Sequence, residues 1–126
     1  MYLRFVTERR NELDNRREGF FQAAYAVRRA PETPEYAVDR LDELLGWFHD
    51  MLDEPDRFSR SRTGAERALS WFRAEARDHI AHAYDIAAVL QEHGVPVTVL
   101  KTRRPGFVVY EDDIQIVAEP FADTPT

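Results

Sequence analysis

Residues 63–121 constrain the fold most strongly, because their pattern predicts one long helix followed by three strands. Thr63 and Glu66 have the spacing of a capping box, which satisfies amide donors at the start of a helix. Gly94 suits a left-handed helix terminator, and Pro96 prevents the helix from resuming. The apolar residues between these ends recur at steps of three and four: Leu69, Phe72, Ala76, Ile80, Ala83, Ala87 and Leu90. The expected helix is about 45 Å long, so it bends or extends toward a second chain.

The segment after Gly94 is predicted to form an antiparallel meander of three strands. Residues 95–102 are rich in β-branched side chains, and 107–110 and 114–119 give the second and third strands. Arg104-Pro105-Gly106 suits a type II turn, with proline at the first corner and glycine where φ is positive. Glu111-Asp112-Asp113 gives a polar turn, which is a simpler interpretation than a cation site.

The first half of the chain is predicted to contain one strand and two helices. Apolar and charged residues alternate over 2–6 as in a half-buried strand, and the charged run 7–18 is interpreted as a loop. A first helix is expected from about Phe20, with Asn15 and Glu18 as caps at its start. Thr33-Pro34-Glu35 is a favourable start for a second helix. Its apolar stripe consists of Val38, Leu41, Leu44, Leu45, Phe48 and Leu52.

These elements together predict an α+β fold. We expect three helices, the third long, packed on one face of a small antiparallel sheet of three C-terminal strands that the N-terminal strand can join. With 126 residues and 44% hydrophobic content, residues 1–121 are expected to form a single domain. Residues 122–126 are expected to be a flexible tail.

Composition narrows the classes of function. The net charge of −6 makes this an acidic protein, and it argues against a broad nucleic-acid-binding surface. Cysteine is absent, which excludes disulfides, thiolate nucleophiles and cysteine-based zinc sites. The sequence has neither an apolar signal segment at its start nor a run long enough to cross a bilayer, so a cytoplasmic location without membrane contact is expected. Lys101 is the single lysine among 17 basic residues, a bias typical of a GC-rich, bacterial-type coding sequence.

An arginine-rich loop is the principal candidate site. It leads into the expected start of the long helix, where free amides and the helix dipole favour phosphate or carboxylate. The turn at Arg104 offers a second basic corner. The alternative is a solvated surface network with the preceding acids Asp53, Glu54 and Asp56. The hypothetical anion-binding residues are Arg57, Arg60, Arg62, Arg67 and Arg104.

Catalytic and metal signatures are weak or absent. His79 and His82 are three residues apart and could share a divalent metal, but nearby carboxylates provide each imidazole with a local partner. No metal, cofactor or catalytic residue is therefore predicted, because nucleophile-elbow, phosphate-loop and dinucleotide patterns are missing. Trp47 and Trp71 are expected either to widen the core or to anchor a partner.

The pattern favours a small non-catalytic interaction or regulatory module that contacts another protein or a second copy through the long helix or a sheet edge. The alternative is an anion-binding protein or enzyme that uses the arginine loop, with His79 or His82 as a proton carrier. Local nucleic-acid binding through the same loop is a third possibility that the net charge disfavours.

Overall fold

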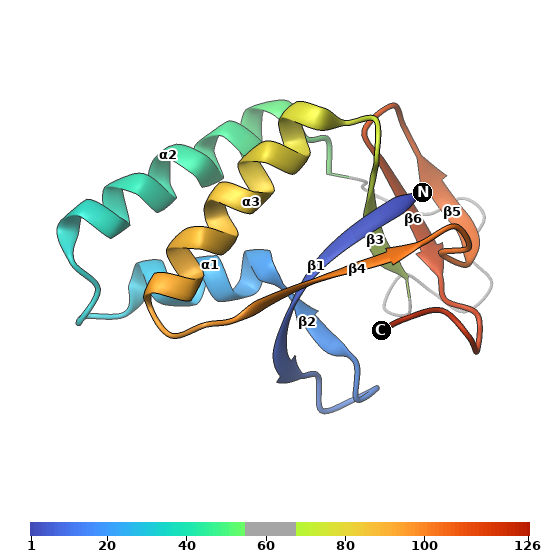
Figure 1. Ribbon diagram of the computed structural model, residues 1–126, viewed down its shortest axis with the longest axis horizontal. Coiled ribbons are helices and arrows are strands. Elements are labelled where there is room, and N and C mark those ends of the chain that lie inside the picture. The colour runs from blue at the N-terminus through green and yellow to red at the C-terminus, as the bar shows by residue number, and fades with distance from the viewer. Residues whose placement is uncertain (55–67) are drawn as a thin grey trace.

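The computed structural model describes residues 1–54 and 68–126 and has the expected α+β architecture (Figure 1). In this part of the chain three helices pack on one face of a six-stranded antiparallel sheet. The helices are α1 Phe20–Arg29, α2 Glu35–Met51 and α3 Arg77–Glu92. The strands are β1 Tyr2–Arg10, β2 Arg17–Gly19, β3 Leu69–Arg73, β4 Val97–Thr102, β5 Phe107–Glu111 and β6 Gln115–Glu119.

The sheet is larger than the three C-terminal strands that we predicted. Its order is β2-β1-β3-β6-β5, and β4 lies on the other edge of β1. β5 and β6 form the expected hairpin, but β4 pairs with β1 from Tyr2↔Thr102 to Thr7↔Val97 instead of with β5. The predicted meander is therefore wrong, because β1 buries side chains on both faces and takes strand partners on both edges.

The long third helix was also predicted wrongly. Leu69 and Phe72 lie in β3, and the helix begins only at Arg77. Trp71 and Phe72 point to opposite faces of the sheet and are both buried, at 1% and 6% exposure. A strand buried on both faces has a continuous apolar run, which spacing alone does not distinguish from a helix. The proposed capping box of residues 63 and 66 lies outside the described part of the chain.

The first two helices occur where the sequence indicates, although their ends differ in detail. α1 has Gly19 as its N-cap, without a side-chain cap, and Asn15 instead lies in the turn between β1 and β2 with φ of 58°. α2 begins directly after Pro34, and the Thr33 hydroxyl donates to the Val27 carbonyl rather than capping α2. α2 and α3 run in opposite directions (Figure 1).

The core lies on both faces of the sheet. Between the sheet and the helices, Phe5 contacts Phe20 at a ring-centroid distance of 5.2 Å and Phe72 at 6.1 Å. A second, smaller cluster fills the opposite face and consists of Val6, Trp71, Leu100 and Ile116. This second cluster explains why the central strands carry apolar residues in both phases of their alternation.

The C-terminal residues contact the rest of the fold. Thr124 is buried, and its hydroxyl donates to the Arg104 carbonyl at 3.2 Å. The Arg17 amide donates to the Thr126 carbonyl at 3.1 Å. Residues 122–126, which we expect to be flexible, thus lie against β2 and the 103–106 loop.

Asp112 organises the turn between β5 and β6. Its Oδ1 atom accepts hydrogen bonds from the amides of Ile114 and Gln115, each at 2.9 Å. Its Oδ2 atom accepts from the Tyr110 hydroxyl at 2.9 Å and from the Gln115 side chain at 3.2 Å. Partial burial raises the pKa of the Asp112 carboxyl, but these donors outweigh it and hold the pKa below its usual value of 3.8.

Asp112→Asn should destabilise the fold by about 1 kcal/mol near neutral pH, a figure that allows for solvent screening of this partly exposed charge. Because the folded pKa is depressed, the ionised carboxylate stabilises the fold above its unfolded pKa, and that contribution is lost as the pH falls through the folded pKa. Urea unfolding at neutral and at acidic pH measures both effects. Asp113→Asn is the matched control, since Asp113 is exposed. An equal loss of stability at both pH values for Asp112→Asn would contradict this role.

Candidate functional site

The predicted arginine site is described only in part. Arg57, Arg60, Arg62 and Arg67 lie outside the described residues, so their anion-binding role stays a prediction. Arg104 is exposed, its Nη1 atom lies 3.2 Å from Asp123 Oδ2, and its guanidinium lies over the Phe121 ring. The structure thus gives Arg104 local partners at the C-terminal end of the chain.

His79 and His82 of α3 pack against Trp47 of α2. His79 is buried, and its Nε2 atom lies 2.7 Å from the Met51 carbonyl oxygen. His82 stacks on Trp47 with ring centroids 3.6 Å apart, and its Nδ1 atom lies 2.7 Å from the Asp78 carbonyl oxygen. Within residues 1–54 and 68–126, no cluster of His, Asp and Glu could hold a metal ion. Trp47 and both histidines therefore pack the helix interface.

A cavity opens where two strands separate. β1 pairs with β3 through Tyr2 and Leu3, and with β2 between Val6 and Arg10. Arg4 and Phe5 lie between these two pairings, at the split between β2 and β3. The cavity at this split has a volume of about 620 Å³. It is lined by residues from both faces of the sheet and from α1 and α2.

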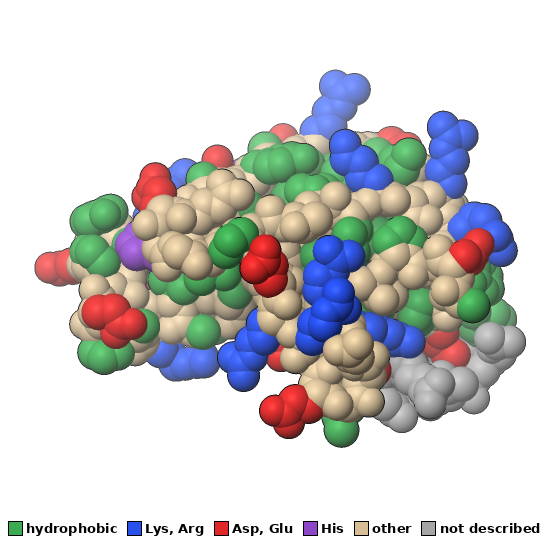
Figure 2. Space-filling model, turned by 60° about the horizontal axis from the view of Figure 1, so that its bottom comes forward, with side chains coloured by type: hydrophobic (Ala, Val, Ile, Leu, Met, Phe, Trp, Pro, Cys, Tyr) green, Lys and Arg blue, Asp and Glu red, His purple; other side chains and the backbone are tan. Residues whose placement is uncertain are grey.

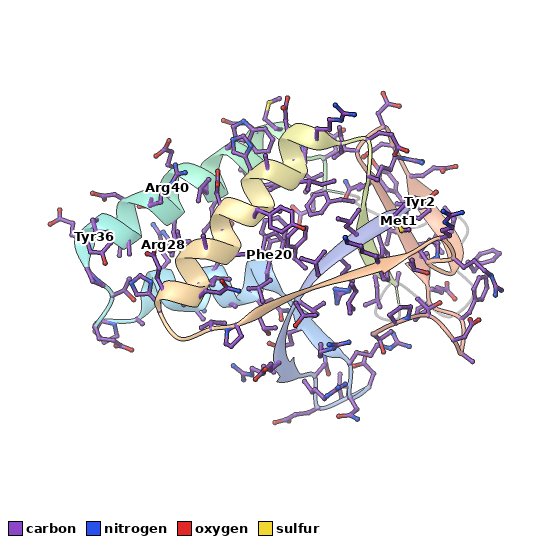
Figure 3. All side chains as sticks on the ribbon, viewed as in Figure 1. Met1, Tyr2, Phe20, Arg28, Tyr36 and Arg40 are labelled. Carbon is purple, nitrogen blue, oxygen red and sulfur yellow. The ribbon has the colours of Figure 1, made fainter. Side chains whose placement is uncertain are left out.

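Aromatic rings form much of the cavity wall. Phe20 lies at the start of α1, between the helices and β1 (Figure 3). Its ring centroid is 4.5 Å from that of Phe21, which in turn is 5.0 Å from Phe48 of α2. The aromatic lining residues are Phe5, Phe20, Phe21, Tyr25, Phe48, Trp71 and Phe72. Such walls suit an apolar or aromatic ligand body.

Arg4 brings a positive charge to this cavity. Its Nη2 atom donates to the Arg17 carbonyl at 3.2 Å, whereas its buried Nε atom has no acceptor among the described residues. Burial, with Arg16 and Arg17 adding repulsion and Asp14 opposing them, lowers the pKa of Arg4 to about 10. Arg4 therefore stays charged at neutral pH, but the described residues compensate its charge incompletely. Figure 2 shows other basic side chains gathered near the centre of the face that carries β2.

Trp71 supplies a second donor. Its side chain is 1% exposed, and its Nε1 atom has no acceptor in the described part of the chain. Arg4 of β1 pairs directly with Leu100 of β4, so their side chains lie on the same face of the sheet. Leu100 packs in the same cluster as Trp71. Because side chains alternate along a strand, Arg4 and Trp71 lie on the same face of neighbouring strands. Both side chains line the cavity, and each carries a buried N–H group without an acceptor among the described residues.

Acidic groups line a different part of the cavity. Asp53 and Glu54 follow α2, and the Asp53 carbonyl accepts a hydrogen bond from Gln115 Nε2 at 2.6 Å. Gln115 pairs with Phe72, which pairs with Leu3, so Gln115 lies two strands from β1. That separation is about 9–10 Å at the usual strand spacing. The cavity therefore has a cationic part and an acidic part.

Sequence reasoning missed both donors. The sequence pattern places Arg4 only in the polar phase of a short strand, and it places Trp71 within the expected long helix. The alternation around Arg4 indicates a side chain on one sheet face, but only the pairing of distant strands shows that this face borders a cavity.

No protein-family model, curated protein or solved structure matches this chain. No helix in the described residues is long and apolar enough to cross a membrane.

Proposed function

We propose that this protein binds a small organic ligand in the cavity between β2 and β3. The supporting observation is a space of about 620 Å³ whose walls carry several aromatic side chains, with charged groups at separate parts of the lining. Ligand sites commonly have volumes of about 300–1,000 Å³ and such a lining. The alternative expected from the sequence is an anion-binding protein or enzyme that uses the arginine loop, whereas the cavity proposed here is lined by different residues.

The direct test is binding of a neutral aromatic probe, 1-naphthaleneacetamide, measured by calorimetry. Ser70 lines the cavity and is exposed, so Ser70→Trp can obstruct the space without replacing a core residue. We expect this substitution to weaken probe binding by about tenfold or more, equivalent to about 1.4 kcal/mol. Glu75→Trp is the control, because it adds the same ring at an exposed position that does not line the cavity. Absence of probe binding to the native protein, or equal binding to both variants, would refute the proposal.

Contact with a second copy of the chain is the second candidate function. β4 pairs with β1 along one edge, and no strand in the described residues pairs with its other edge. A free edge can add an antiparallel strand from another chain. Residues 69–76 are not helical, so the long helix expected from the sequence no longer supports this hypothesis. The free edge of β4 is the main support for it. Sedimentation velocity should then show a concentration-dependent dimer, and a monomer at every concentration would exclude it.

A further inference from the structure

We infer that the ligand is an organic carboxylate with an aromatic body, whose head accepts hydrogen bonds from Arg4 Nε and Trp71 Nε1; this inference rests on the proposed function. Arg4 Nε and Trp71 Nε1 are buried N–H groups that lack an acceptor among the described residues. A buried donor without an acceptor is destabilising, and these two belong to side chains on the same face of neighbouring strands. One ligand head with two acceptor oxygens can satisfy both.

Charge gives the second argument. Arg16 and Arg17 add positive potential at Arg4, and Asp14 is the carboxylate that opposes them. The Asp14 carboxylate already accepts from the Arg16 amide at 3.0 Å and lies 3.8 Å from Arg16 Nη1. A ligand anion would therefore compensate a charge that the described residues leave only partly balanced.

The number of available donors favours a carboxylate over a phosphate. Arg4 already uses Nη2 to hold the Arg17 carbonyl, which leaves a limited set of donors for a ligand. A planar monoanion matches one partly engaged guanidinium and one indole N–H better than a dianion with three acceptor oxygens.

The acids of the cavity restrict where the head can lie. Asp53 and Glu54 would repel an anion, but Asp53 is bonded through its carbonyl to Gln115, two strands from β1. The aromatic side chains Phe20, Phe48 and Phe72 also line the cavity, from the helix face. The ligand body accordingly contacts these rings, and its head lies at Arg4, away from Asp53.

A matched pair of probes tests this arrangement. The anion 1-naphthaleneacetate and the neutral 1-naphthaleneacetamide differ only at the head, so calorimetry with both isolates the effect of charge. The native protein should bind the carboxylate at least about tenfold more tightly than the amide. Arg4→Gln should abolish that preference while amide binding persists, which also shows that the variant is folded. Trp71→Phe, which removes the N–H and retains a ring, should weaken carboxylate binding several-fold.

Arg9→Gln is the control, because Arg9 lies on the same strand but is exposed and near Glu18. It should leave the preference for the carboxylate intact. Equal affinity of the native protein for both probes would overturn the carboxylate inference and leave the proposed cavity function standing. A carboxylate preference that survives Arg4→Gln would also overturn it. If neither probe binds, the proposed function itself fails.

Discussion

Phe72→Asp is expected to unfold the protein. The Phe72 ring packs against Phe5 and Phe48, with centroids 6.1 and 6.0 Å away, and its strand is hydrogen-bonded on both sides. Removing a buried phenylalanine costs about 3–5 kcal/mol, and a carboxylate in its place adds a further desolvation cost. The sum is comparable with the whole stability of a small domain, about 5–15 kcal/mol. A thermal melt followed by circular dichroism measures the effect.

Two other substitutions make that melt interpretable. Phe72→Leu keeps most of the apolar volume and should remain folded with a lower melting temperature. Ile80→Asp should cost less than Phe72→Asp, because Ile80 is only partly buried at the margin of the core. A cooperative, native-like melt of Phe72→Asp would show that residue 72 is not in the core.

Gly106→Ala should destabilise the fold by about 3 kcal/mol or more. Gly106 has φ of +139°, a conformation that residues with a Cβ atom rarely adopt. A Cβ atom there would lie 2.0 Å from the Glu119 carbonyl oxygen and 2.9 Å from Pro120 Cα, both in the backbone. Neither atom can move aside without shifting the end of β6. Urea unfolding should show the loss as a lower midpoint with little change in slope.

Gly46→Ala is the control for this result, since it makes the same change inside α2. Apart from its chain neighbours and the helix's own backbone, no atom of the described residues lies within 4 Å of a Cβ atom placed at residue 46. Alanine favours the helix, so we expect a gain of about 0.5–1 kcal/mol. Similar stability changes for the two variants would contradict the backbone geometry at Gly106.

The parts of the fold that were predicted from sequence are those governed by local signals. α1 and α2 have clear helical spacing, and α2 begins at the expected Pro34-Glu35. The β5–β6 hairpin has its turn at Asp112, as the polar run indicated. In each case neighbouring residues determine the structure.

The errors concern long-range contacts. Leu69 and Phe72 fit a helical period, but β3 is stabilised by pairing with β1 and β6, which are distant in sequence. β4 pairs with β1 at sequence separations from 90 (Thr7↔Val97) to 100 (Tyr2↔Thr102) rather than with the adjacent β5. Short apolar runs do not specify such partners, because pairing depends on the register and burial of the whole sheet.

The candidate site was less predictable than the fold for the same reason. Arg104 belongs to a recognisable turn and was therefore noticed, whereas Arg4 is one charged residue in an alternating strand. Its importance arises because β2 and β3 pair with different ends of β1 and leave a cavity between them. Only the register of these three strands provides that information.

The central claim is that Arg4 and Trp71 present their unpaired N–H groups to a ligand in one cavity. Nitrogen–proton correlation spectra can observe Arg4 Nε–H and Trp71 Nε1–H directly during titration with 1-naphthaleneacetate. We predict that both signals shift together and saturate at the same probe concentration as the backbone amides of Gly19 and Ser70, which line the cavity. Unchanged Arg4 and Trp71 signals at saturating probe would contradict the claim.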